Sequence, residues 1–123
     1  MSEVLTKLPE VFDQEAFNLE RWRELEADSF LASLDCRIET NQHGQIVMVP
    51  PPGFQHSQLQ SRVMQCLLED MRGEGQVCPE CPVSTSGGVK GIDVVRVSNG
   101  RVEAGLRRNV LTIAPEICIE VRP

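Results

Sequence analysis

Apolar positions in the first third of the chain recur at mixed helical spacing. Between residue 13 and about residue 34 the bulky side chains follow three- and four-residue steps, and Asp13 stands where a helix cap is expected. A break near residues 27–29 would let Ser29 cap a second short helix. We therefore expect residues 1–35 to form an N-terminal helical segment. Its apolar residues are Phe17, Trp22, Leu25, Phe30 and Leu31.

The next segments alternate between strand and helix patterns. Residues 36–40 and 45–49 predict a hairpin that turns over residues 41–44, and three prolines at 50–52 end it. Residues 55–72 predict a long helix, with Gly73 and Gly75 after it. The apolar stripe of that helix is Leu59, Val63, Cys66, Leu67 and Met71.

The last third predicts strands. Residues 76–78, 82–86, 92–98 and 117–122 have strand character, and Gly87-Gly88 and Asn99-Gly100 indicate tight turns. Residues 101–110 predict a loop or one helical turn. The whole pattern favours an α+β class, and a length of 123 residues suits a single domain over 1–123.

Composition narrows the classes of protein. An apolar fraction of 41% and a net charge of −6 are those of a globular chain without a broad nucleic-acid-binding face. A metal-dependent nuclease remains possible, because bound metal offsets acidic residues. No stretch is apolar enough to cross a membrane and no signal peptide precedes the helix, so we expect a cytoplasmic protein. The basic cluster Arg101, Arg107 and Arg108 is expected in a solvated loop.

Five cysteines leave two interpretations open. Cys66 and Cys118 lie in apolar patterns and are expected to be buried. Cys78 and Cys81 have the spacing of half a zinc site, but no second pair follows. Reduced thiols in a cytosolic setting are the alternative.

Three acids occupy strand-like segments where apolar residues are expected. Glu39, Asp93 and Glu120 each sit beside an isoleucine, and Glu120 lies in what reads as a buried strand. A buried carboxylate is costly unless it is paired or binds metal. Residues two apart in a strand share a face, so we expect Arg122 beside Glu120. Carboxylates that converge from neighbouring strands would suit Mg²⁺, whereas edge acids or ion pairs are the alternative.

Two further residues are candidates for contact with phosphate. His56 opens the long helix, where the helix N-terminus also favours anions, although a capping or packing role is the alternative. Lys90 is the nearest lysine to Asp93, and its alternative is a solvent-facing turn residue.

Several segments carry a family resemblance. They are Arg37-Ile38-Glu39, residues 43–53, His56-Ser57, residues 92–95 and residues 114–123. Their order and spacing resemble the Uma-two family of restriction endonucleases, within the PD-(D/E)XK nuclease superfamily, from about residue 36 to the end.

The resemblance implies a fold, a reaction and site residues. It implies a restriction-endonuclease-like core, a mixed β-sheet flanked by helices over 36–123, and phosphodiester cleavage in DNA with Mg²⁺, or Mn²⁺, often by a homodimer. By position, Asp93 and Glu120 would be metal ligands and Glu39 a third. Arg122 takes the place of the motif lysine.

The chain departs from the family pattern at the same positions. Ile92-Asp93 replaces Pro-Asp, and Arg122 cannot easily act as a general base. The helix that supplies the cation in other members is expected to be missing, so the core is expected to be short at its C-terminal end. A catalytically weak or inactive module for binding or dimerisation is therefore the runner-up, and an unrelated α+β protein with salt-bridged acids is the third reading.

Overall fold

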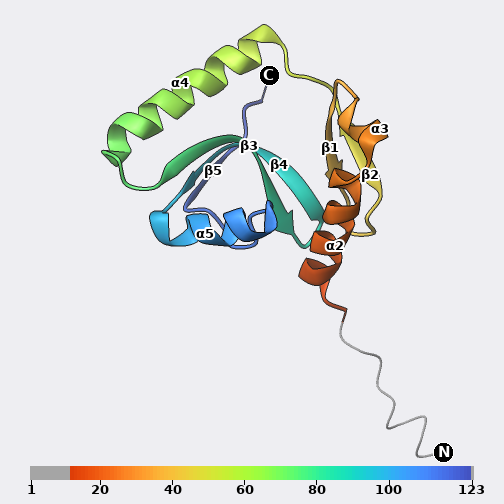
Figure 1. Cartoon of the computed structure of the whole chain (residues 1–123). Helices are drawn as coiled ribbons and strands as arrows, with labels where there is room; N and C mark the ends of the chain where they lie inside the picture. The colour runs from red at the N-terminus through yellow and green to blue at the C-terminus, as the bar shows by residue number, and fades with distance from the viewer. Residues whose placement is uncertain (1–11, 123) are drawn as a thin grey trace, which may run out of the picture.

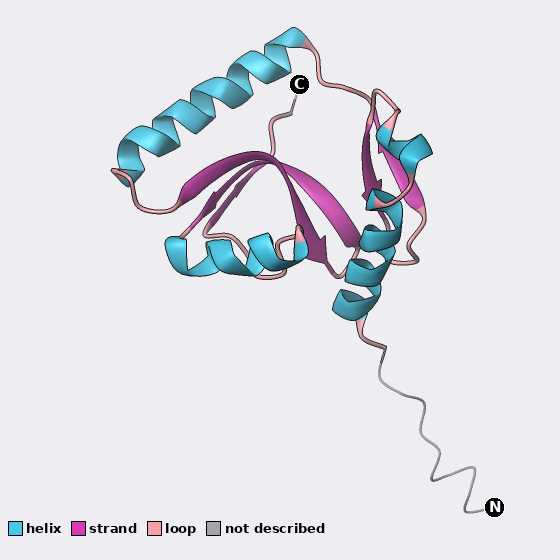
Figure 2. Cartoon of the chain, viewed as in Figure 1, coloured by secondary structure: helices cyan, strands magenta, loops and turns pink. Residues whose placement is uncertain are grey.

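A computed structural model describes residues 12–122. A three-stranded antiparallel sheet with the order β3-β4-β5 lies between two helices, α4 on one side and α5 on the other (Figure 1). A separate hairpin and the first helices flank this unit next to β4 (Figure 2). The expected α+β class is confirmed. Pairing within both sheets is antiparallel, and the parallel element is a single bridge between Val83 and Leu111.

The described part of the predicted N-terminal segment forms the two expected helices, α2 (Gln14–Glu26) and α3 (Ser29–Ala32), and residues 1–11 of that prediction lie outside the described residues. The Asp13 side chain accepts a hydrogen bond from the Ala16 amide, as an N-cap does. Asp28, rather than Ser29, caps α3. The fully buried Asn18 anchors α2, because its amide donates to Ser84 Oγ at 3.0 Å and to the Thr85 carbonyl at 2.8 Å.

The predicted hairpin is present as β1 (Arg37–Thr40) and β2 (Ile46–Val49). Two contacts fix β1 against β4: Thr40 Oγ1 accepts from the Val89 amide at 2.9 Å, and Glu39 Oε2 accepts from the Gly91 amide at 2.7 Å. The hairpin therefore carries Glu39 to the sheet.

Helix α4 (Phe54–Met71) also matches its prediction and ends at Arg72, which has a positive φ of 51°. Its apolar stripe covers the sheet only in part. Met71 is buried, whereas Leu59 and Cys66 are exposed. The polar residue Gln60 is buried, and its side chain contacts β4.

The two predicted strands at 76–78 and 82–86 are one strand, β3 (Gln76–Thr85), paired along its length with β4 (Gly88–Val97). Pro79 and Pro82 do not interrupt it because β3 is an edge strand, where a missing amide donor costs no ladder bond.

The expected tight turn at Asn99-Gly100 is wrong. These residues begin helix α5 (Asn99–Arg108), which also replaces the loop expected over 101–110. Val102 of α5 packs on the core cluster of Val83, Val95, Val97 and Leu111. An amphipathic ten-residue helix over this cluster buries more apolar surface than a hairpin turn would.

The closing strand is shorter than predicted. β5 covers Ile117–Ile119, and Glu120 and Arg122 lie beyond it and are exposed. The prediction that Glu120 and Cys118 are buried is therefore wrong, since β5 is the edge of the sheet and carries little cover. Among residues 12–122 no helix is long and apolar enough to cross a membrane.

Candidate acidic site between the sheet and helix α4

Asp93 is the centre of the site. Its side chain is only 5% exposed, and Oδ2 accepts a hydrogen bond from the Val121 amide at 2.8 Å. The same oxygen lies 3.3 Å from His56 Nε2, and Oδ1 lies 3.7 Å from Arg37 Nη1. A carboxylate this buried is stable because each oxygen has a polar or cationic partner.

A backbone irregularity turns Asp93 toward α4. Ile92 and Val95 are three residues apart, yet both pack on the core cluster under α5, as do Cys78 and Cys81 of the partner strand. Regular alternation would put each such pair on opposite faces. Glu80, opposite Asp93, has a φ of 48°, which breaks the alternation. Asp93 therefore faces away from that core.

Glu120 and Glu39 each accept a hydrogen bond from a backbone amide of β4, at Asp93 and close to it. Glu120 Oε1 accepts from the Asp93 backbone amide at 3.2 Å. Glu39 Oε2 binds the Gly91 amide, two residues earlier in β4. The structure thus brings the three acids predicted from the sequence to the middle of β4, although Glu120 is exposed and Glu39 is half-buried.

Helix α4 contributes two polar side chains one turn apart. His56 contacts the Asp93 carboxylate through Nε2, while its Nδ1 is buried without a hydrogen-bond partner. Gln60 donates to the Asp93 carbonyl at 2.7 Å. Residues four apart lie on one helix face, which explains why both reach the same strand position.

Two site residues escaped the sequence analysis. Arg37 lies between Asp93 and Glu80, with Nη1 3.8 Å from Glu80 Oε1. The sequence did indicate that Arg37 lies beside Glu39, because residues two apart in a strand share a face. Glu80 gave no such signal, since its orientation depends on the backbone irregularity.

The sequence of the chain matches a known protein family. The sequence model of the family Uma2, described as "Putative restriction endonuclease", matches residues 19–122. The chain belongs to the Uma2 family. No match is found among curated proteins or among solved structures.

The remaining two predicted site residues, Lys90 and Arg122, make no hydrogen bond or ion pair with Asp93. Lys90 donates from Nζ to the Thr40 carbonyl at 3.1 Å and so holds the β1 turn. Arg122 is exposed and lines an open cavity of about 610 Å³ with His56 and the first turn of α4. This cavity adjoins the acidic site through His56, which belongs to both.

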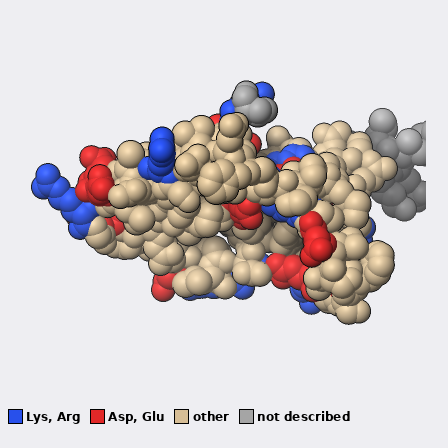
Figure 3. Space-filling view, turned by 90° about the horizontal axis from the view of Figure 1, so that it is seen from above, with Lys and Arg blue, Asp and Glu red and all other residues tan. Residues whose placement is uncertain are grey.

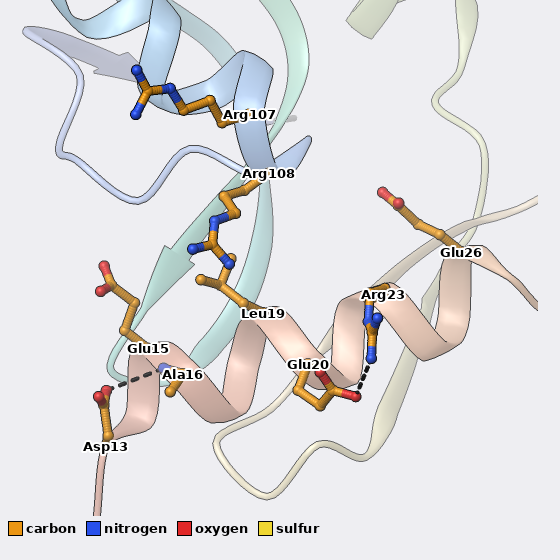
Figure 4. Close-up of a pocket in the computed structure, with 9 residues that line it drawn as sticks. All are labelled: Asp13, Glu15, Ala16, Leu19, Glu20, Arg23, Glu26, Arg107 and Arg108. Carbon is orange, nitrogen blue, oxygen red and sulfur yellow. Dashed lines mark hydrogen bonds and ion pairs between the residues drawn. The ribbon is translucent and has the colours of Figure 1, made fainter.

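Among the residues that the structure describes, no continuous basic patch is seen on the face shown in Figure 3. In the view from above, acidic and basic side chains are scattered over a mostly uncharged face (Figure 3). The cluster expected in a loop is on α5, where Arg107 and Arg108 line a cavity opposite the acidic helix α2 (Figure 4). Arg101 pairs with Glu116 at 3.3 Å. Of these three arginines, Arg101 is therefore paired with an acid, and Arg107 and Arg108 face a cavity that acidic residues of α2 also line.

The donor set suits a hard divalent cation in its chemistry. Asp93, Glu120 and Glu39 supply carboxylate oxygens, the ligand type that Mg²⁺ prefers. As the side chains lie, no group of three His, Cys, Asp or Glu residues within 12–122 is arranged to hold an ion. Arg37 and His56 occupy the vicinity of Asp93 instead. The same finding gives no support to a zinc site at Cys78 and Cys81, and all five thiols are free.

Proposed function

We propose that this Uma2 protein is an endonuclease that hydrolyses phosphodiester bonds in DNA with Mg²⁺, or Mn²⁺, as cofactor. The observation that supports it is the reciprocal contact of Asp93 and Glu120. The Asp93 amide donates to Glu120 Oε1, the Val121 amide donates to Asp93 Oδ2, and Glu39 accepts from the Gly91 amide two residues before Asp93. The resemblance to restriction endonucleases implies acids at these positions as metal ligands, and the structure holds all three on β4 or beside it.

Asp93, Glu120 and Glu39 would hold the metal ion. When bound, such an ion polarises a phosphoryl oxygen and lowers the pKa of water. Gln60 and the Val121 amide keep Asp93 in place through its carbonyl and its carboxylate. The role of these two groups is therefore to orient Asp93.

His56 and Arg122 are the proposed contacts to DNA phosphate. Both line the open cavity at the start of α4, where helix amides add a favourable field for anions. Lys90 was the other candidate, and its bond to Thr40 suits a positioning role for β1. Because the chain carries a net charge of −6, DNA binding would depend on these few local cations.

The second candidate function is a catalytically weak or inactive module that binds or dimerises. One observation favours it: among the described residues, the permanent cation nearest Asp93 is Arg37, and no lysine contacts the site acids. An arginine stays protonated and cannot easily serve as a general base. We also propose that the protein forms a homodimer. We propose a reducing, cytoplasmic location, which suits the five free thiols.

Calorimetry with Mg²⁺ and Mn²⁺ tests the metal site. We expect wild-type protein to bind either ion, and Asp93→Ala and Glu120→Ala to weaken binding at least tenfold, because each removes a carboxylate ligand. Glu103→Ala, an exposed acid on α5, is the matched control and should leave affinity unchanged. Equal affinities in all four proteins would rule out this site. Metal binding without cleavage of DNA would favour the second candidate.

A further inference from the structure

Arg37 is held at the centre of the acidic site by contacts from three strands. It belongs to β1, where it pairs with Val49. Its guanidinium Nη1 lies 3.7 Å from Asp93 Oδ1 on β4 and 3.8 Å from Glu80 Oε1 on β3. The cation thus bridges two carboxylates that the hairpin β3–β4 places opposite each other.

The protein leaves room for this side chain. A Cβ atom at Gly91 would stand 3.3 Å from both Arg37 Cδ and Arg37 Nε, so glycine allows the arginine stem to lie on the β4 backbone. Arg37 Nε is buried and has no hydrogen-bond partner within the described chain. The side chain is only 26% exposed. Such a position is costly for a solvated surface arginine and points to a fixed role.

Most charged groups around Arg37 are negative. Asp93, Glu80, Glu39 and Glu120 contribute four carboxylates to this part of the sheet. The other basic group in contact with Asp93 is His56, which is charged only when protonated. Arg37 is therefore the permanent positive charge among the described residues that contact Asp93.

We propose that Arg37 is the built-in countercation of the acidic site and restrains its affinity for divalent metal. The proposal rests on the metal site of the proposed function. In the metal-free protein Arg37 neutralises Asp93 and prevents repulsion among the acids. A divalent cation must share Asp93 with it, so Arg37 sets the concentration at which metal enters. It is a positioning residue that acts through Asp93.

Arg122 is the natural comparison, because it stands in the lysine position of the family pattern. It is exposed and makes no ion pair with a described acid, whereas Arg37 lies between two of them. The positive charge of Arg37, and not that of Arg122, should therefore weaken metal binding. A unit charge within about 4–6 Å of an ion affects its binding strongly when the site is partly buried.

Calorimetric titration of the metal-free protein with Ca²⁺ and with Mn²⁺ tests this assignment. We expect Arg37→Gln to bind either ion at least fivefold more tightly than wild type, and Arg37→Lys, which keeps the charge, to stay within about twofold. Arg122→Gln should equal wild type. As a second readout, 5 mM Ca²⁺ should raise the Tm of Arg37→Gln more than that of wild type.

The outcomes separate this inference from the proposed function. Unchanged or weaker metal binding in Arg37→Gln, with normal binding in wild type, overturns the role of Arg37 alone. Absence of binding in both proteins overturns both proposals. If Arg37→Gln does not fold, Arg37→Met keeps the stem that covers Gly91 and carries the same expectation.

Discussion

Asp93 is joined to Glu120 and its neighbour Val121 by two hydrogen bonds that run in opposite directions. The Asp93 amide donates to Glu120 Oε1 at 3.2 Å, and the Val121 amide, next to Glu120, donates to Asp93 Oδ2 at 2.8 Å. The ladder between β4 and β5 ends at Val94 and Ile119. These two bonds therefore continue the strand contact through side chains, so that the acidic site and the end of the sheet are one structure.

Loss of the buried Asn18 amide should destabilise the protein. Asn18→Ala removes donors to Ser84 and Thr85 and leaves the Thr85 carbonyl without its partner. We expect the free energy of unfolding to fall by about 2–3 kcal/mol, the cost of a broken buried polar contact. Urea denaturation followed by circular dichroism measures it.

Gln65→Ala is the matched control, since Gln65 is an exposed amide on α4. It should change stability by less than about 0.5 kcal/mol. Equal effects of the two substitutions would show that α2 is not anchored through Asn18.

Alkaline pH should weaken the fold through Cys81. Burial raises the pKa of this thiol from an ordinary 9.0 to about 11, and the neighbouring Cys78 and Cys118 thiols add to the shift. A pKa that is higher in the folded chain gives stability that is complete below the unfolded value and is lost as pH rises from about 9 toward about 11. Urea denaturation at pH 8 and pH 10.5 should show this loss.

In Cys81→Ala the loss between these two pH values should be smaller than in wild type. The chain contains no tyrosine, so phenol ionisation does not obscure the comparison. An identical pH dependence in the two proteins would contradict the buried, protonated thiol.

Acid should weaken the contact between the start of α5 and the segment before β5. The hydrogen bond from Ser98 lowers the pKa of the Glu116 carboxyl below its ordinary 4.5, and the Arg101 guanidinium acts in the same direction. A lowered folded pKa gives stability that is present above the unfolded value and is lost as pH falls through the folded one. Wild type should therefore exceed Glu116→Gln in stability at pH 6.

From pH 6 toward pH 3 the stability difference between the two proteins should shrink, because protonation of Glu116 leaves an uncharged group at this position, as Gln does. Chemical denaturation at pH 6 and at pH 3 measures the difference in unfolding free energy, and Glu103→Gln, an exposed acid on α5, is the control. A gap between wild type and Glu116→Gln that is as large at pH 3 as at pH 6 would disprove the charge-based account.

Sequence patterns identified the elements wherever local signals agreed with the tertiary environment. Asp13 caps α2, and the stripe from Leu59 to Met71 marks α4. The failures came from context. The prolines of β3 are tolerated because the strand lies at an edge, and Asn99-Gly100 opens a helix because α5 covers the core. Neither fact is visible in a window of a few residues.

The candidate site was predictable in its acids and not in its cations. Acidic residues in apolar strands pointed to Glu39, Asp93 and Glu120, and His56 was placed by its position at a helix start. Arg37 contacts Asp93 across two strands, β1 and β4, at the point where Glu80 on the facing strand β3 has a positive φ. This contact joins residues that are far apart in the sequence, so a short stretch of sequence does not show it.

Relaxation of supercoiled plasmid DNA in Mg²⁺ or Mn²⁺ tests the central claim most directly. The account predicts that purified wild-type protein nicks the plasmid, that chelation of metal stops it, and that Asp93→Asn lowers the rate at least a hundredfold. Glu103→Gln should cleave at the wild-type rate. Intact plasmid at excess wild-type protein in either metal, or equal cleavage by Asp93→Asn, would contradict the account.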